Sequence, residues 1–174
     1  MLKKLKEKEL VDYEKYGKIT LTKTGRKKAL DIIRKHRLWE TFLYEKLEFS
    51  WDEVHEVAEQ LEHIQSEKLV DKLEKLLEYP DFDPHGDPIP NKKGEIKVQV
   101  KKTLSDVAVG SSCQMVAVKD DSSSFLQYVI EVGLELNSKI VVVSKQEYDA
   151  ITVIAVNGVK SSVSQMFAEN IFVV

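Results

Sequence analysis

The sequence predicts an α+β protein with a helical N-terminal part and a small C-terminal β-barrel. Residues 22–79 contain three stretches with apolar residues at helical spacing, each preceded by a serine or threonine suited to capping. Residues 103–174 are instead rich in Val, Ser and Ile, with short strand-like runs around a single helix-like segment. All four prolines lie within residues 80–90, which predicts an extended loop between the two parts.

Length and composition limit the class of protein. The 174 residues suit one ordinary domain or two small ones, and 43% hydrophobic with 32% charged residues is typical of a soluble globular chain. No apolar run approaches the roughly 20 residues of a membrane span, and the N-terminus lacks the apolar centre of a signal peptide. The single cysteine, Cys113, cannot form an internal disulfide. We therefore expect a cytoplasmic protein.

The N-terminal residues predict the end of a helix (1–9) followed by a hairpin (9–22) with Gly17 in its turn. Residues 1–28 hold ten Lys/Arg and four Asp/Glu, a balance of +6. Such charge can steer a protein toward nucleic acid, although taken alone it more often marks a solvated helix face. The helix has no N-cap, which predicts that the chain starts inside a larger unit.

Three helices are expected in the middle of the chain. Each has a capping residue at its start, and the last is followed by a proline that disfavours further helix. The predicted helices are 22–47 with Thr22 or Thr24 as cap, 50–64 with a Ser50–Glu53 capping box, and 66–79 with Ser66 as cap and Pro80 after its end.

The stretch "HEVAEQLEH" (residues 55–63) is the main chemical signal. At about 100° per residue, its two histidines and two of its glutamates lie within an arc of about 100° on one helix face. His36 and Glu40, spaced i, i+4 on the preceding helix, share a face in the same way. This pattern has two interpretations: a solvated polar face, or two ligand-bearing faces that meet around a metal ion. Helical spacing does not choose between them.

The ligand types indicate which metal such a site would bind. Imidazole and carboxylate groups without a thiolate suit Mn²⁺ or Fe²⁺ better than a structural Zn²⁺ site. No H-E-x-x-H motif, paired E-x-x-H motifs, phosphate-binding loop or nucleophile elbow is present. The sequence therefore predicts a metal-binding protein that is not an enzyme.

Three stretches together resemble the diphtheria toxin repressor family of metal-dependent transcriptional repressors: "LTKTGRKKAL", "VHEVAEQLEHIQSEKLVDKLEKLL" and "DPHGDPIP". The resemblance implies an SH3-like barrel of the ferrous-transport A type at the C-terminus. It also implies the domain boundaries, namely a remnant of a winged helix-turn-helix (1–22, the end of the recognition helix and the wing), metal-binding and dimerisation helices (23–90), a linker (91–102) and the SH3-like domain (103–174).

The resemblance divides the candidate ligands between two sites. Where iron-responsive members often have cysteine, this chain has a glutamate at 59, which resembles the manganese-responsive branch. The primary site would hold Glu59, Glu62 and His63; the ancillary site would hold His36, Glu40 and His55, joined in some members by Asp83, His85 and Asp120 or Asp121. For His85, ligation and an ordinary turn role beside Gly86 both remain open.

The implied function is a Mn²⁺- or Fe²⁺-dependent repressor of metal-homeostasis genes, in which metal stiffens a homodimer for operator binding. The alternative is a truncated metal-sensing and dimerisation module without specific DNA binding of its own. The family's earlier DNA-reading helices, and one more primary-site ligand, would precede Met1. Four lysines could contact DNA phosphates, which position a protein without specifying sequence: Lys3, Lys4, Lys15 and Lys18.

Overall fold

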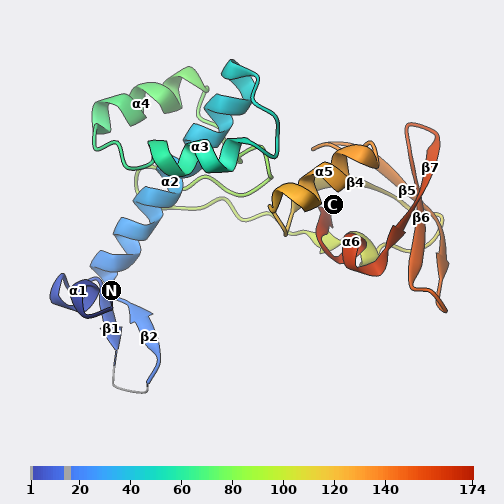
Figure 1. The fold of residues 1–174 in the computed structure, drawn as a ribbon, viewed down its shortest axis with the longest axis horizontal. Helices are drawn as coiled ribbons and strands as arrows, with labels where there is room; N and C mark the ends of the chain where they lie inside the picture. The colour runs from blue at the N-terminus through green and yellow to red at the C-terminus, as the bar shows by residue number, and fades with distance from the viewer. Residues whose placement is uncertain (1, 14–16) are drawn as a thin grey trace.

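A computed structural model describes residues 2–13 and 17–174 of the chain. Figure 1 shows three consecutive parts: a small N-terminal helix and hairpin, a group of helices, and a β-rich C-terminal domain. The predicted α+β organisation is therefore correct. The predicted DNA contact at Lys15 lies outside the described residues, as does Met1.

The N-terminal part is anchored on the long helix that follows it. Helix α1 (Leu2–Glu7) leads into strands β1 (Val11–Tyr13) and β2 (Ile19–Leu21), which pair antiparallel in the predicted hairpin. A Cβ on Gly25 would lie 1.8 Å from the carbonyl oxygen of Leu10, so only glycine permits this approach.

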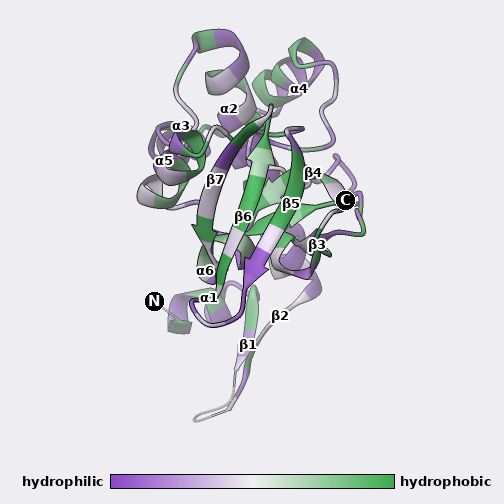
Figure 2. Ribbon diagram, turned by 90° about the vertical axis from the view of Figure 1, so that its right-hand side faces the viewer, coloured by the Kyte–Doolittle hydropathy of each residue, from purple (hydrophilic) through white to green (hydrophobic). Residues whose placement is uncertain are grey.

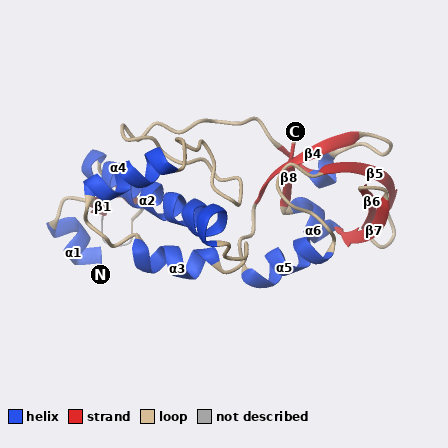
Figure 3. Cartoon of the chain, turned by 90° about the horizontal axis from the view of Figure 1, so that it is seen from above, coloured by secondary structure: helices blue, strands red, loops and turns tan. Residues whose placement is uncertain are grey.

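Helix α2 (Lys23–Leu47) organises the central part, and both α3 (Val54–Leu61) and α4 (Glu67–Leu76) contact it. Thr22 is its N-cap, as predicted, because the Thr22 hydroxyl accepts a hydrogen bond from the N–H of Gly25. Figure 3 shows these helices gathered at the end of the molecule away from the strands. Their shared core consists of Leu38, Trp39, Leu43, Val54, Ala58, Val70, Leu73, Leu77 and Ile89.

Helix α3 is shorter than predicted at both ends. The predicted capping box is half formed, since the N–H of Ser50 donates to the Glu53 carboxylate but the Ser50 hydroxyl bonds carboxylates rather than the helix backbone. The helix consequently begins at Val54 and ends at Leu61. His63 therefore lies in a turn beyond the helix, and the helical angles used to place it do not apply there.

Helix α4 begins as predicted at Ser66, whose hydroxyl accepts from the N–H of Leu69. It stops before Pro80, because Glu78 and Tyr79 both adopt left-handed backbone conformations with φ of 59°. The proline-rich loop then folds back on itself through a bridge between Phe82 and Pro88.

The C-terminal domain is a six-stranded antiparallel sheet in the order β3-β8-β4-β5-β6-β7. Figure 2 shows apolar residues concentrated along its central strands. The expectation of one helix here is wrong, because α6 is also present; it has only five residues, too few for a periodic signal. The elements are β3 (Lys102–Thr103), β4 (Ser112–Val118), α5 (Ser123–Glu131), β5 (Lys139–Gln146), β6 (Ile151–Val156), β7 (Val159–Ser164), α6 (Gln165–Glu169) and β8 (Ile171–Val173).

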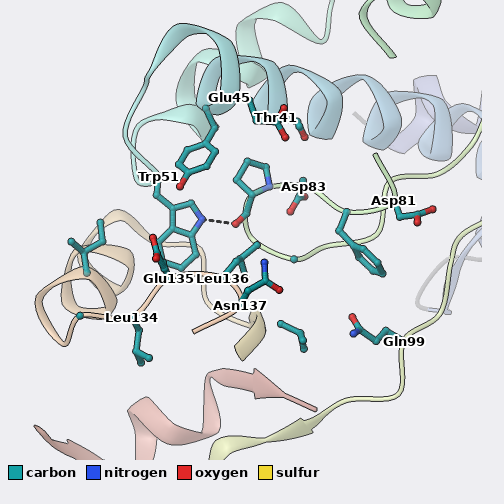
Figure 4. Close-up of a pocket in the computed structure, with 17 residues that line it drawn as sticks. Thr41, Glu45, Trp51, Asp81, Asp83, Gln99, Leu134, Glu135, Leu136 and Asn137 are labelled. Atoms are coloured by element: carbon teal, nitrogen blue, oxygen red, sulfur yellow. Dashed lines mark hydrogen bonds between the residues drawn. The ribbon is translucent and has the colours of Figure 1, made fainter. Parts of the chain in front are cut away.

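The two parts meet at Trp51 and the proline-rich loop. Trp51 packs into the core of the C-terminal domain, although it belongs to the α2–α3 connection. Its indole N–H donates to the carbonyl of Pro84 at 2.8 Å (Figure 4), and the carbonyl of His85 accepts from the N–H of Val118 at 3.0 Å. A cleft of about 1050 Å³ lies beside this contact and is lined by both parts. The contact places the loop between the helices and the sheet.

Candidate metal centre

Three ligand-type atoms from α2 and α3 form a nearly equilateral triangle. His36 and Glu40, one turn apart on α2, place Nε2 and Oε1 3.0 Å from each other. His55, near the start of α3, places its Nδ1 3.2 Å from each of these two atoms. The predicted opposition of the two helix faces is therefore present for these three residues.

This triangle requires a positive charge within it. Glu62 lies 2.8 Å from Nδ1 of His36, and because an ionised carboxylate can only accept, Nδ1 carries the hydrogen. Uncharged His36 would then direct a bare Nε2 at the Glu40 oxygen. Such lone pairs stay close only if a proton or a cation lies between them. Ligands about 2.1 Å from an octahedral ion are about 3.0 Å apart, so the donor set fits a divalent metal.

A second group shares Glu40 and adds two residues of the proline-rich loop. Glu40, Asp83 and His85 each offer a ligand atom, and these three atoms lie within 4.8 Å of one another. All three side chains are buried. Nε2 of His85 donates to the carbonyl of Trp51 at 3.0 Å, so an uncharged His85 directs its bare Nδ1 toward Glu40, 3.9 Å away. The loop histidine is therefore a potential ligand as well as a turn residue.

The cluster holds protons that a metal would displace. Burial alone would lower the pKa of His36, but hydrogen bonds and charges from Glu40 and Glu62 raise it above its usual value. Burial acts to raise the pKa of Glu40, yet the hydrogen bond and charge of His36 hold it below its usual range. Burial and the neighbouring Glu40 raise the pKa of Asp83 to about 8. Metal binding here would release protons, so it is favoured by rising pH.

The remaining predicted ligands are more dispersed. Glu59 is exposed, with Oε1 3.6 Å from Nε2 of His55, and His63 is also exposed. Among the described residues, neither joins a group of potential ligands, so Glu59, Glu62 and His63 are not assembled as a separate centre. Asp121 lines the cavity of about 200 Å³ next to the triangle, whereas Asp120 accepts a hydrogen bond from the N–H of Ser122.

The predicted DNA contacts lie apart from this cluster. Lys3 and Lys4 are exposed on α1, and Lys18 is exposed just before β2. No ion pair of these three lysines with a described residue is present at 4.0 Å or less. They are therefore available to a phosphate backbone.

Sequence reasoning missed Arg37 and Trp51, which hold the loop at the cluster. The Arg37 guanidinium bonds Asp87 at 2.8 Å, donates to the carbonyl of Pro88 at 2.6 Å and lies 3.4 Å from Asp83. Helical spacing gives the direction of the Arg37 side chain but not the path of a loop about fifty residues later. The acidic residues of that loop were the only available signal.

Two known families match successive parts of the chain. Residues 22–91 match the iron-dependent repressor metal-binding and dimerisation domain, and residues 102–174 match the FeoA domain. The iron-dependent repressor IdeR of Mycobacterium tuberculosis is 42% identical over 72 residues, which are 41% of this chain and 31% of that protein. A probable metal transport system membrane protein of Chlamydia pneumoniae is 50% identical over 76 residues, 44% of this chain and 17% of that protein.

A solved structure extends the likeness over the whole fold. A manganese-dependent transcriptional repressor in complex with manganese is 35% identical, with a TM-score of 0.88, and the match covers 99% of this chain and 81% of that one. The chain belongs to the diphtheria toxin repressor family. ScaR with bound Cd²⁺ is similarly related, at 34% identity and a TM-score of 0.79, with coverage of 99% and 81%. The family's members named here are metal-dependent repressors, and the chain spans less than a third of the curated relatives' length.

Proposed function

We propose that the chain is the metal-sensing and dimerisation part of a cytoplasmic Mn²⁺- or Fe²⁺-dependent transcriptional repressor of metal-homeostasis genes. The His36–Glu40–His55 triangle is the observation that carries this proposal, because its donor types and spacing suit a divalent ion. A bound ion would supply positive charge that joins α2 to α3. Through Glu40 it would also restrain the loop that carries Asp83 and His85.

Homodimer formation is the second part of the proposal. Trp39 and Leu43, which the sequence offers as candidates for an apolar seam, are buried in the chain's own core. Other apolar side chains on the helices remain exposed and could form a contact between copies, and the matched family domain is named for dimerisation. These exposed residues are Ile32, Ile33, Leu47, Leu69 and Leu76.

We expect Mn²⁺ to raise the melting temperature and sedimentation to show a dimer at micromolar concentration. An ion present at about 100 times its Kd stabilises the native state by about 2.7 kcal/mol through mass action. Differential scanning fluorimetry with and without Mn²⁺ measures the shift, with Ca²⁺ as the control because it prefers an all-oxygen site. Equal shifts with both ions, or none with Mn²⁺, would count against the proposed centre.

A second candidate function is a metal-sensing and dimerisation module without specific DNA binding. It is favoured because, among residues 2–13 and 17–22, only the six-residue α1 and a short hairpin precede α2. We expect the chain alone to bind DNA weakly and without sequence preference, through lysine–phosphate contacts that weaken steeply between about 50 and 200 mM salt. Fluorescence anisotropy with promoter and scrambled duplexes tests this. Mn²⁺-dependent, sequence-specific binding that survives the higher salt would instead assign the complete repressor function to this chain.

A further inference from the structure

We propose that Glu62 is a positioning residue for the triangle, holding His36 in the tautomer that presents Nε2 to the metal. This inference rests on the proposed function, since it gives that site an outer carboxylate. It differs from the role that the family resemblance implies for Glu62, which is direct ligation beside Glu59 and His63. The present geometry favours a bond from Glu62 to a ligand over a bond to the metal.

The position of Glu62 at the end of α3 makes this bond possible. Glu62 is the C-cap residue, with φ −60° and ψ −20°, and its N–H still bonds the carbonyl of Ala58. Its side chain is 17% exposed, and Oε2 lies 2.8 Å from Nδ1 of His36 on the neighbouring helix. The bond therefore joins the end of α3 to α2 on the side of the imidazole opposite the triangle.

The two faces of the His36 ring system have different partners. Nε2 contacts only the two other members of the triangle, Glu40 and His55, within hydrogen-bonding distance. Nδ1 has Glu62 as its one described hydrogen-bond partner. Without the Glu62 carboxylate, nothing described here would keep the hydrogen on Nδ1, and the hydrogen could move to Nε2, where it would block ligation.

Carboxylate–imidazole pairs of this kind orient the ring and raise its basicity as a ligand. Removal of such an outer partner typically lowers metal affinity by about 10- to 100-fold. Glu59 offers an internal comparison, because its carboxylate lies 3.6 Å from the outer nitrogen of His55 but is 65% exposed. The shorter and more buried Glu62–His36 pair is the stronger constraint.

Two substitutions separate positioning from ligation. Glu62→Gln keeps an oxygen that can accept from Nδ1, whereas Glu62→Ala removes the acceptor. If Glu62 positions His36, the Gln variant retains most of the Mn²⁺ affinity and the Ala variant loses about 10- to 100-fold by calorimetry. Equal, large losses in both variants would indicate direct ligation and overturn the proposal. Glu59→Gln is the matched control on the same helix.

The tautomer is measured without metal. Long-range ¹H–¹⁵N NMR of the metal-free protein at about pH 9, where the imidazole is uncharged, reports which ring nitrogen of His36 carries the hydrogen. We expect Nδ1–H in the wild type, Glu62→Gln and Glu59→Gln, and a mixture in Glu62→Ala. Nε2–H in the wild type, or an unchanged spectrum in Glu62→Ala, would overturn the positioning role. The expected tautomers in a wild type that binds no Mn²⁺ would uphold that role and contradict only the proposed metal function.

Discussion

Glu40→Gln should weaken Mn²⁺ binding by at least about 100-fold, equivalent to about 2.7 kcal/mol. Glu40 is the residue common to both potential ligand groups, and its Oε1 lies 3.0 to 3.9 Å from ring nitrogens of three histidines. The side chain is also 2% exposed, so water cannot readily replace the lost charge. Glutamine keeps the shape while removing the negative charge that a cation requires.

Calorimetric titration with Mn²⁺ measures this loss, and Glu45→Gln is its matched control. Glu45 lies on the same helix and is exposed, and its described ion pair is with Lys46 at 3.3 Å. The control should bind Mn²⁺ as the wild type does. Wild-type affinity in Glu40→Gln would remove the metal from this cluster.

The same variant reports on the electrostatics of the metal-free protein. Glu40 and Glu62 together raise the pKa of His36 against the opposing effect of burial. Loss of the Glu40 charge should therefore lower the pKa of His36 by NMR titration, so that less imidazolium is present at neutral pH. A fall in the pKa together with a loss of affinity would show that proton and metal use the same triangle.

The sequence predicted the part of this cluster that depends on helical spacing. The i, i+4 pair His36 and Glu40 must share a face of α2, and an antiparallel neighbour can place His55 opposite. The same reasoning was wrong for the position of His63, because it assumed a helix that continues past Leu61. Helix ends depend on local backbone bonds, which residue periodicity does not encode.

The loop could not be placed from the sequence. Its prolines predict an extended path, but Asp83 and His85 reach Glu40 through contacts with Arg37 and Trp51, which lie far away in the chain. In the C-terminal domain, β7 was missed because Val163 is its only buried residue, so it lacks a clear apolar alternation. Long-range contacts and edge strands are thus the features that the sequence did not reveal.

Gly86→Ala should detach the proline-rich loop from β4, whereas Gly110→Ala should not. Both glycines have φ of +82°, so alanine costs each position a similar backbone strain of about 1–2 kcal/mol. At Gly86 the added Cβ would also lie 2.0 Å from the carbonyl oxygen of Val116 and 2.6 Å from Cα of Ala117. At Gly110 nothing lies within 4 Å, which makes it a control for strain alone.

Hydrogen exchange at Val118 measures the detachment directly, because its N–H bonds the carbonyl of His85. Exchange should become faster in Gly86→Ala and stay unchanged in Gly110→Ala. Since His85 and Asp83 lie in the displaced loop, Mn²⁺ affinity should fall in the first variant alone if the loop takes part in binding. Equal exchange rates in the two variants would mean that the loop tolerates the added methyl group without moving away from the sheet. A faster exchange with unchanged affinity would confine metal binding to the triangle between α2 and α3.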